Sequence, residues 1–585
     1  MKRFNNNKKF VLFFFLFLLL VVSLWEYFVC IRDPLLTSLD QADMALVARN
    51  LVKKNGFYTD AIWLWDIYWG SVHHPESRWP LLQSIITALF FHIFGETVAV
   101  QKLVTSLFLL CLICAVFLIG TKLFGMWSGL LAACLVLAND RIPSLMAYSL
   151  NDIGASFFQI SALFSLFRYF EENNRLKKLV LAGIWTGVAI HQKFQSVYLV
   201  FGFLVWSFFI WKVNLWKRVK TAAVFLLVLV VIGFPLFIRN YKTFHTLVYP
   251  GDKLVNALGS AWDPSVNRWR GQMVYYKLYF EHERVSYGYL LKHRGARYLF
   301  FERPFREFRR LLRLIITGVI VEQPVFILGL LGMVLCGRNH KKWVLWNLVL
   351  IIASFSFVCF RSIEPRYYLF LVPMLSIFGG RFLEVFLAKL WRKNKPFAVI
   401  VGVSISFILV FSVKDKYIKS VSLTEEQKAQ NIRFLSMCEW LKKNTSPTEG
   451  IFSWRAGEVA FHSQRGSATI PNVDLTRFIL LAEQYNIRYI HLENWKLYKM
   501  FFNRAGTQHW LLRQLAPLFV GREIYGFKLV YHDHDELYLY RVPLPSEVDL
   551  ESLPKLPPEP EDFTLLLLEP EAGGIKEYPP PLSIE

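Results

Sequence analysis

Charged residues recur at the ends of apolar segments that are otherwise nearly free of charge. Asp40 and Asp43 follow the first such segment, Asp152 begins another, Lys193 stands between two, and Arg366 precedes a further one. Asp40 and Asp43 are three residues apart, so a helix over about 40–54 places both carboxylates on one face. Ionisable groups placed repeatedly at one membrane face predict a catalytic or binding site there.

The same residues also have purely structural interpretations, which the sequence leaves open. Asp40 and Asp43 suit the cap and first turn of a helix, where the helix dipole favours acids. Asp152 could likewise cap a helix, and Lys193 could extend from an apolar surface toward the lipid headgroups. Arg366 could pair with a neighbouring acid. The recurrence of these residues at one face favours the functional interpretation.

The composition is that of an integral membrane protein with room for one soluble domain. The chain has 585 residues, of which 54% are hydrophobic and 17% aromatic, too apolar for a soluble protein of this length. The first apolar segment, 10–31, is too long for a signal-peptide core and lacks a small-residue cleavage site, so we expect a retained helix. Further membrane spans are predicted at 98–120, 126–139, 152–170, 177–191, 194–211, 221–238, 314–336, 342–360, 367–388 and 396–413.

The distribution of basic residues orients these roughly eleven spans. With the N-terminus in the cytoplasm, the inner loops hold twenty basic residues and two acids, Glu171 and Glu172. The basic ones are Lys2, Arg3, Lys8, Lys9, Lys122, Arg168, Arg175, Lys177, Lys178, Lys212, Lys217, Arg218, Lys220, Arg338, Lys341, Lys342, Lys389, Arg392, Lys393 and Lys395. Much of the excess behind the net charge of +22 therefore lies in loops that orient the protein, and nucleic-acid binding is not predicted.

This orientation requires the apolar segment 80–94 to remain on the outer face, because a crossing there would move every later basic loop outside. The segment is also short for a span, so we expect a juxtamembrane or re-entrant helix. The predicted transmembrane domain is 1–415, with outer loops 32–98 and 239–312. Residues 421–543 are predicted as a small α/β domain outside the cytoplasm, and the Pro/Glu-rich tail 544–585 as disordered.

Several motifs resemble the GT-C membrane glycosyltransferases, in particular the branch of protein O-mannosyltransferases and lipid A aminoarabinose transferases. They are DQADMALVARNL from Asp40, PLLxxIITALFFHIFG from Pro80, RNY at 239–241, YPG at 249–251 and EPRYYLFLVP at 364–373. The resemblance extends over about 10–543 and lies in the order and common sidedness of these motifs. The family usually has Asp-Glu in the first motif, and here Gln41 replaces the Glu.

The resemblance implies a multi-span α-helical fold and an inverting transfer of sugar from a polyprenyl-phosphate donor. The acceptor would be a lipid, glycan or protein at the outer face of the cytoplasmic membrane. Asp40 matches the catalytic aspartate, which acts as a general base. Fixed cations would stabilise the departing phosphate. The candidate substrate-binding residues are Lys193 and Arg366, followed by Arg78, Arg239 and Arg361, with Asp43 and Asp152.

A divalent metal held by Asp40 and Asp152 is left open by the resemblance, and no other cofactor is implied. His73, His74 and Glu76 are close in the sequence, but adjacent histidines in a loop do not by themselves converge on one ion. Two other functions stay open: a lipid-sugar flippase or transporter, and a scaffold that has lost catalysis. A transporter should place ionisable groups near the middle of the bilayer, whereas the charges here cluster at one face.

Overall fold

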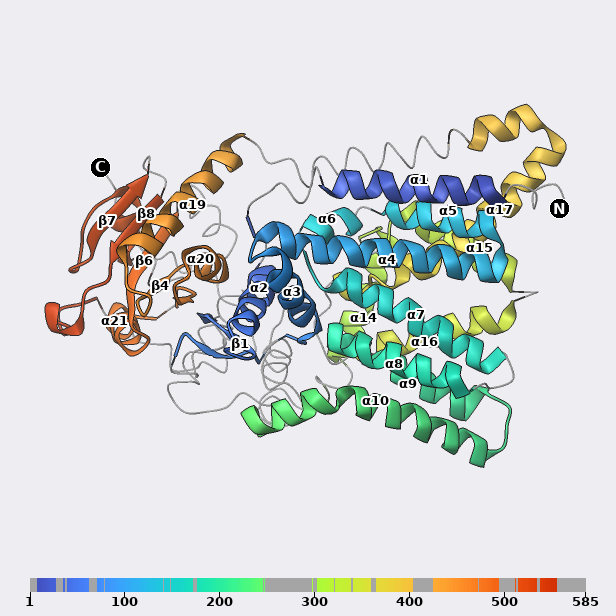
Figure 1. The fold of residues 1–585 in the computed structure, drawn as a ribbon, viewed down its shortest axis with the longest axis horizontal. Helices are drawn as coiled ribbons and strands as arrows, with labels where there is room; N and C mark the ends of the chain where they lie inside the picture. The colour runs from blue at the N-terminus through green and yellow to red at the C-terminus, as the bar shows by residue number, and fades with distance from the viewer. Residues whose placement is uncertain are drawn as a thin grey trace. The chain divides into compact units, whose positions relative to one another are not determined.

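Apolar helices form one unit of the chain, and a six-stranded sheet forms the core of the other (Figure 1). The structure is a computed structural model. The described residues are 8–27, 35–36, 39–62, 71–77, 79–139, 141–147, 149–171, 176–245, 247, 297, 302–319, 321–337, 340–358, 365–402, 404, 425–471, 473–493, 511, 514–533 and 537–554. The predicted site residues Arg78 and Arg361 and most of the predicted tail lie outside them.

The helical unit contains most of the predicted spans. Its helices are α1 (Lys8–Glu26), the start of α2 (Leu39–Val52), α3 (Leu82–Phe94), α4 (Val98–Phe124), α5 (Met126–Leu137), α6 (Arg141–Ala147), α7 (Asp152–Glu171), α8 (Leu176–Gln192), η4 (Phe194–Val197), α9 (Tyr198–Val205), η5 (Trp206–Ile210), α10 (Leu215–Phe244), α14 (Arg303–Ile316), α15 (Gln323–Cys336), α16 (Lys341–Val358), η7 (Pro365–Tyr368) and α17 (Leu371–Lys393).

Five helices within the described residues are long and apolar enough to cross a membrane: α1, α4, α7, α10 and α17. The chain is therefore a multi-pass membrane protein. Several other apolar helices are shorter than 18 residues, so the total of about eleven spans stays a prediction. The predicted span 314–336 was wrong, because the helix is interrupted between Ile316 and Gln323. Gly318 there has a positive φ of 76°, which a continuous helix does not allow.

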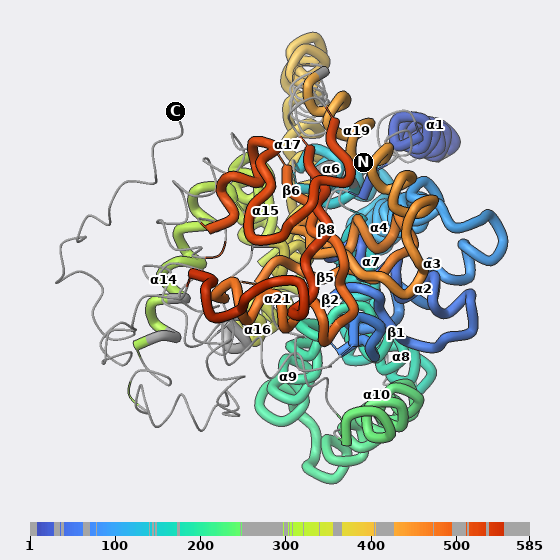
Figure 2. Tube along the Cα trace, turned by 90° about the vertical axis from the view of Figure 1, so that its left-hand side faces the viewer, coloured from blue at the N-terminus to red at the C-terminus, as the bar shows by residue number. Residues whose placement is uncertain are grey.

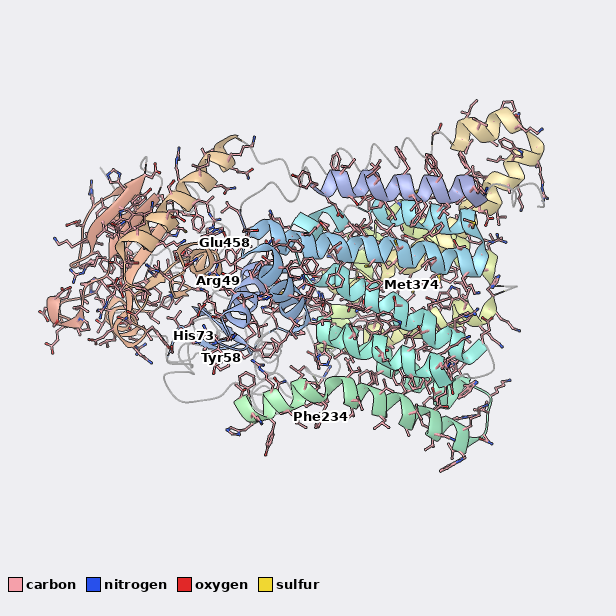
Figure 3. The ribbon with its side chains drawn as sticks, viewed as in Figure 1. Arg49, Tyr58, His73, Phe234, Met374 and Glu458 are labelled. Atoms are coloured by element: carbon pink, nitrogen blue, oxygen red, sulfur yellow. The ribbon has the colours of Figure 1, made fainter. Side chains whose placement is uncertain are left out.

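Glycines let three of these helices approach closely. A Cβ atom added at Gly332 of α15 would lie 2.1 Å from the carbonyl oxygen of Phe378 in α17. One added at Gly380 of α17 would lie 2.4 Å from the carbonyl oxygen of Ser128 in α5. Figure 3 labels Met374, which is buried inside this unit, and Phe234 of α10, which is 57% exposed. Exposed apolar side chains of this kind suit contact with lipid.

The second unit is built on a mixed sheet with the strand order β2-β5-β4-β6-β8-β7. The strands are β2 (Ala61–Ile62), β4 (Gly450–Phe452), β5 (Ser467–Ala468), β6 (Ile487–Glu493), β7 (Lys528–Asp533) and β8 (Leu537–Arg541). The neighbouring helices and turns are α19 (Glu425–Asn444), α20 (Ala456–Ser463), α21 (Leu475–Gln484), η8 (Ala516–Val520) and η9 (Pro545–Glu547). Figure 2 shows the strands from a second side, with α21 beside them. The described part of 421–543 contains both helices and strands.

One strand of this sheet comes from the first loop, which the sequence prediction kept apart from the C-terminal segment. β2 pairs in parallel with β5 through Ala61 and Ser467. Beside it, β1 (Tyr58–Thr59) and β3 (His74–Pro75) form a small antiparallel pair. Residues 45–62 and 71–77 therefore belong to the same unit as the C-terminal strands.

Candidate functional site

The first charged pair of the helical unit joins Asp40 to Arg366. Asp40 lies in the first turn of α2, where a carboxylate is favoured by the helix dipole. Arg366 lies in the single turn η7, just before α17. Its Nη1 donates to Oδ2 of Asp40 at 2.6 Å, and the two side chains are 20% and 22% exposed. The pair is therefore held firmly but remains accessible to a ligand.

The second charged pair, Asp152 with Lys193, is almost completely buried. Asp152 begins α7, and Lys193 is the extended residue between α8 and η4. The Lys193 ammonium donates to Oδ1 of Asp152, and the side chains are 7% and 0% exposed. The other carboxylate oxygen, Oδ2, is buried and has no hydrogen-bond partner among the described residues.

Tyr367 lies against the cations of both pairs. The Lys193 ammonium is 4.7 Å from the centre of its ring, and the Arg366 guanidinium carbon is 5.8 Å from the same point. Both are distances at which a cation is attracted to an aromatic face. The structure thus brings Asp40, Lys193 and Arg366 together, with Asp152 as a fourth member. The roles of these residues stay a prediction.

Buried amides hold the segments that carry the second pair. Nδ2 of Asn151 donates to the carbonyl of Gln192 at 2.7 Å, and Nε2 of Gln192 donates to Oε1 of Gln83 at 2.6 Å. Each amide neighbours a residue of the pair in the sequence, yet nothing in the local sequence marks the amides as part of the site. A buried amide is recognisable only when its partner is known, since hydrogen-bonded polar residues occur in most cores.

The remaining predicted site residues are placed less centrally. Asp43 is buried and accepts a hydrogen bond from the indole of Trp79 at 3.2 Å. Arg239, near the end of α10, donates to the amide oxygen of Asn240 and lies over the ring of Phe244. The substrate-binding roles of these two residues stay predictions.

The described residues do not form a divalent metal site. Asp40 and Asp152, the two predicted ligands, are each engaged by a side-chain cation. No group of three or more His, Cys, Asp or Glu side chains converges anywhere in the described part of the chain. The unpartnered oxygen of Asp152 could accept an ion, but one oxygen does not make a site. The metal therefore stays a prediction.

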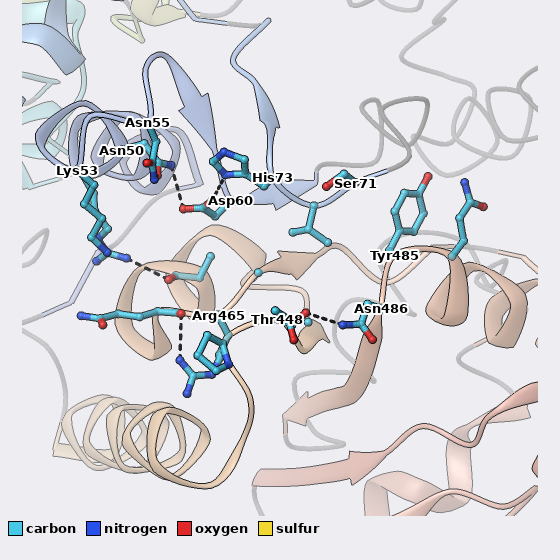
Figure 4. A pocket seen from close by; sticks show the side chains of 18 residues that line it. Asn50, Lys53, Asn55, Asp60, Ser71, His73, Thr448, Arg465, Tyr485 and Asn486 are labelled. Atoms are coloured by element: carbon cyan, nitrogen blue, oxygen red, sulfur yellow. Dashed lines mark hydrogen bonds and ion pairs between the residues drawn. The ribbon is translucent and has the colours of Figure 1, made fainter.

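The sheet unit has a polar cavity of about 450 Å³, seen from close by in Figure 4. Nδ1 of His73 donates to one oxygen of Asp60 at 2.6 Å, and Nδ2 of Asn50 donates to the other at 2.9 Å. The His73 ring also stacks on Tyr58, with the ring centres 4.7 Å apart. These contacts fix the orientation of the His73 ring. They do not bring His73 and His74 together as ligands of one metal ion.

The charges at this cavity stabilise one another. Burial alone would raise the pKa of Asp60, but the hydrogen bonds from His73 and Asn50, together with the positive charges of His73 and Arg49, outweigh burial and lower it. The hydrogen bond to Asp60 raises the pKa of His73, against the opposing effect of burial. Arg465, which also lines the cavity, donates to the carbonyls of Lys442 and Thr445 at 2.7 Å. The Arg465 guanidinium therefore already binds backbone carbonyls of the protein.

Comparisons with known proteins find similarity in both sequence and fold. Residues 74–238 match the family described as dolichyl-phosphate-mannose-protein mannosyltransferase. The crystal structure of the Archaeoglobus fulgidus oligosaccharyltransferase with zinc and sulfate is 14% identical, with a TM-score of 0.57 over 90% of this chain and 73% of that one. The same archaeal enzyme, AglB, with an inhibitory peptide and a dolichol-phosphate gives the same identity and score over 90% and 74%.

The match to a second enzyme extends over almost the whole length of that enzyme's chain. ArnT from Cupriavidus metallidurans, bound to undecaprenyl phosphate, is 14% identical, with a TM-score of 0.56 over 92% of this chain and 99% of that one. No curated protein matches the chain in sequence. At these identities the structural matches establish the fold.

Proposed function

We propose that this chain, a GT-C membrane glycosyltransferase by its fold, transfers a sugar from a polyprenyl-phosphate donor to an acceptor hydroxyl or similar group. The family resemblance predicted from the sequence is confirmed. We place the reaction at the outer face of the cytoplasmic membrane, where the predicted topology puts Asp152 at the start of α7 and Arg366 in η7.

The reaction would be a single displacement with inversion. The acceptor oxygen attacks the anomeric carbon of the donor sugar and forms the new glycosidic bond. The bond from that carbon to the phosphate oxygen breaks, and polyprenyl phosphate leaves with the electron pair. Asp40 takes the acceptor proton as general base. Lys193 and Arg366 offset the charge that develops on the leaving phosphate.

The Asp40–Arg366 pair is the observation that carries this proposal. Arg366 cannot give the same guanidinium face to a carboxylate and to a phosphate. A bound donor would therefore draw Arg366 toward its phosphate and release Asp40 to accept a proton. The partial exposure of both side chains permits this exchange. Charged residues at helix starts also support a transferase over a transporter, which needs charges along its translocation path.

The test is replacement of Asp40 by Asn, which keeps the shape of the side chain and removes its basicity. Cells without the protein would be complemented with the unmodified chain or with Asp40→Asn, and their glycolipids, glycans and glycoproteins compared by mass spectrometry. We expect a hexose or pentose to be missing from one carrier in the deletion cells and in the variant.

Asp549→Asn is the matched control, because Asp549 is an exposed aspartate outside the charged pairs. It should restore the modification fully. Equal protein levels in the membrane would be checked by immunoblot. An Asp40→Asn chain that restores the modification as well as the unmodified chain would rule out Asp40 as the base. It would then favour the scaffold interpretation suggested by Gln41.

A further inference from the structure

The helix α14 has the most sharply divided surface of the described helices. Over Arg303–Ile316 it reads RPFREFRRLLRLII. At 3.6 residues per turn, the positions of its five arginines fall within an arc of about 120°. Six of its seven large apolar residues, all but Leu314, fall on the complementary side. This pattern is typical of a helix lying in the plane of a membrane interface.

The burial of the side chains divides the apolar side into two bands. Leu311 and Ile315 are buried within the helical unit. Phe305 and Ile316, next to the arginines, are 63% and 65% exposed. An exposed apolar band thus lies between the packed edge of the helix and its arginine face. In a bilayer, that band would contact acyl chains while the arginines reach the headgroups.

The connectivity places α14 at the end of the bundle where Arg366 lies. α14 leads into α15, α15 turns into α16 at the basic segment before Lys341, and α16 returns toward Arg366. Figure 2 shows α14 at the edge of the described helices. The basic loops that orient the protein lie at the opposite end, so orientation does not account for the arginines of α14.

The choice of basic residue also differs between the two ends. The twenty basic residues of the predicted inner loops comprise fourteen lysines and six arginines, whereas α14 has five arginines and no lysine. Arginine binds phosphate oxygens in a bidentate manner, whereas lysine acts as a point charge. Arg309, Arg310 and Arg313 are exposed. Their chemistry and position fit a row of phosphate groups.

We propose that α14 is a binding site for the phosphate headgroups of anionic phospholipids in the bilayer. Phe305, Phe308 and Leu312 insert among the acyl chains, and Arg309, Arg310 and Arg313 bind the phosphates. The site is independent of the transferase proposal, because it requires no sugar donor.

The first experiment measures the lipids retained by the purified full-length protein. The triple variant Arg309→Gln, Arg310→Gln, Arg313→Gln would be compared with the control Lys389→Gln, Arg392→Gln, Lys393→Gln at the other end of the bundle. We expect the first variant to lose at least threefold of its co-purified phosphatidylglycerol relative to phosphatidylethanolamine, and the control to lose less. Lysine at the three α14 positions should give an intermediate loss. Equal retention in the two glutamine variants would overturn the proposal.

The second experiment does not depend on the folding of a multiple variant. A photo-crosslinking amino acid would replace Phe308, or Lys528 on the exposed surface of the sheet unit as the control. The protein would be reconstituted in vesicles of phosphatidylglycerol and phosphatidylethanolamine. We expect phospholipid adducts at position 308 and none at 528. Crosslinks at 308 only to protein, or to polyprenyl phosphate without phospholipid, would contradict the assignment.

Discussion

Replacing Lys193 by Met should destabilise the helical unit far more than loss of a surface charge. Lys193 and Asp152 are 7% and 0% exposed, so the substitution leaves a carboxylate buried without its counter-charge. Oδ2 of that carboxylate already has no described partner. Removing one partner of a buried pair costs about 3–5 kcal/mol. The same change at an exposed lysine costs about 0–1 kcal/mol.

A double substitution separates the buried charge from the loss of packing. In Lys193→Met with Asp152→Asn no charge remains buried, so we expect more than half of the lost stability to return. Unfolding would be induced by titrating dodecyl sulfate into mixed micelles. It would be followed by maleimide reaction of Cys336, which is 3% exposed in the folded chain. Lys389→Met, at an exposed position, is the control.

Two outcomes would refute this reasoning. The pair would not be buried if Lys193→Met cost no more than Lys389→Met. The residues would not be coupled if the double variant were as unstable as the sum of the two single variants. Lys193→Arg keeps the charge and should fall between the unmodified chain and Lys193→Met.

Three further predictions concern other parts of the molecule. Arg366→Met should lower sugar transfer by about 100- to 1,000-fold, because a fixed cation at the leaving phosphate is lost. The control Arg392→Met should leave sugar transfer unchanged. Equal transfer rates of the two variants in reconstituted vesicles would contradict the role of Arg366. The His73–Asp60 pair should stabilise the fold most between the ordinary pKa of Asp, about 3.8, and that of His, about 6.5. Because folding raises the pKa of His73, its contribution is lost as the pH rises through that raised pKa. Because folding lowers the pKa of Asp60, its contribution is lost as the pH falls through that lowered pKa. Hydrogen exchange of 58–62, corrected for intrinsic rates, should therefore be slower at pH 6 than at pH 8.5, and His73→Gln should remove the difference. Gly332→Ala should destabilise the helical unit by about 1–3 kcal/mol, because the new Cβ would clash with α17. Gly402→Ala is the control, since nothing lies within 4 Å of a Cβ at that position. Equal unfolding midpoints of the two variants would argue against close packing at Gly332.

The positions of the charged residues at helix ends could be predicted from the sequence, but their pairing could not. Asp152 begins a helix and Asp40 lies in the first turn of another, as their local sequences indicate. Asp40 of α2 meets Arg366 of η7 across 326 residues, a contact that depends on the tertiary fold. No local pattern specifies which cation a carboxylate will find.

The two errors in the fold have different physical origins. The interruption within 314–336 was foreseeable, because Gly318 can adopt the left-handed region and Pro324 favours the first turn of a new helix. β2 was not foreseeable. With two residues, Ala61 and Ile62, it carries no alternation, and it becomes a strand only because β5 supplies a partner edge.

The ion pair between Asp40 and Arg366 also bears on fidelity. A transferase that holds an activated sugar at a wet surface risks donating it to water. In the resting protein the Arg366 guanidinium holds Oδ2 of Asp40, so that oxygen is already engaged and would leave water unactivated. Asp40 would be released to accept a proton only when a ligand competes with it for Arg366. Because donor hydrolysis also needs a cation at the leaving phosphate, we expect replacement of Arg366 by a neutral residue to raise the ratio of hydrolysis to transfer while both rates fall.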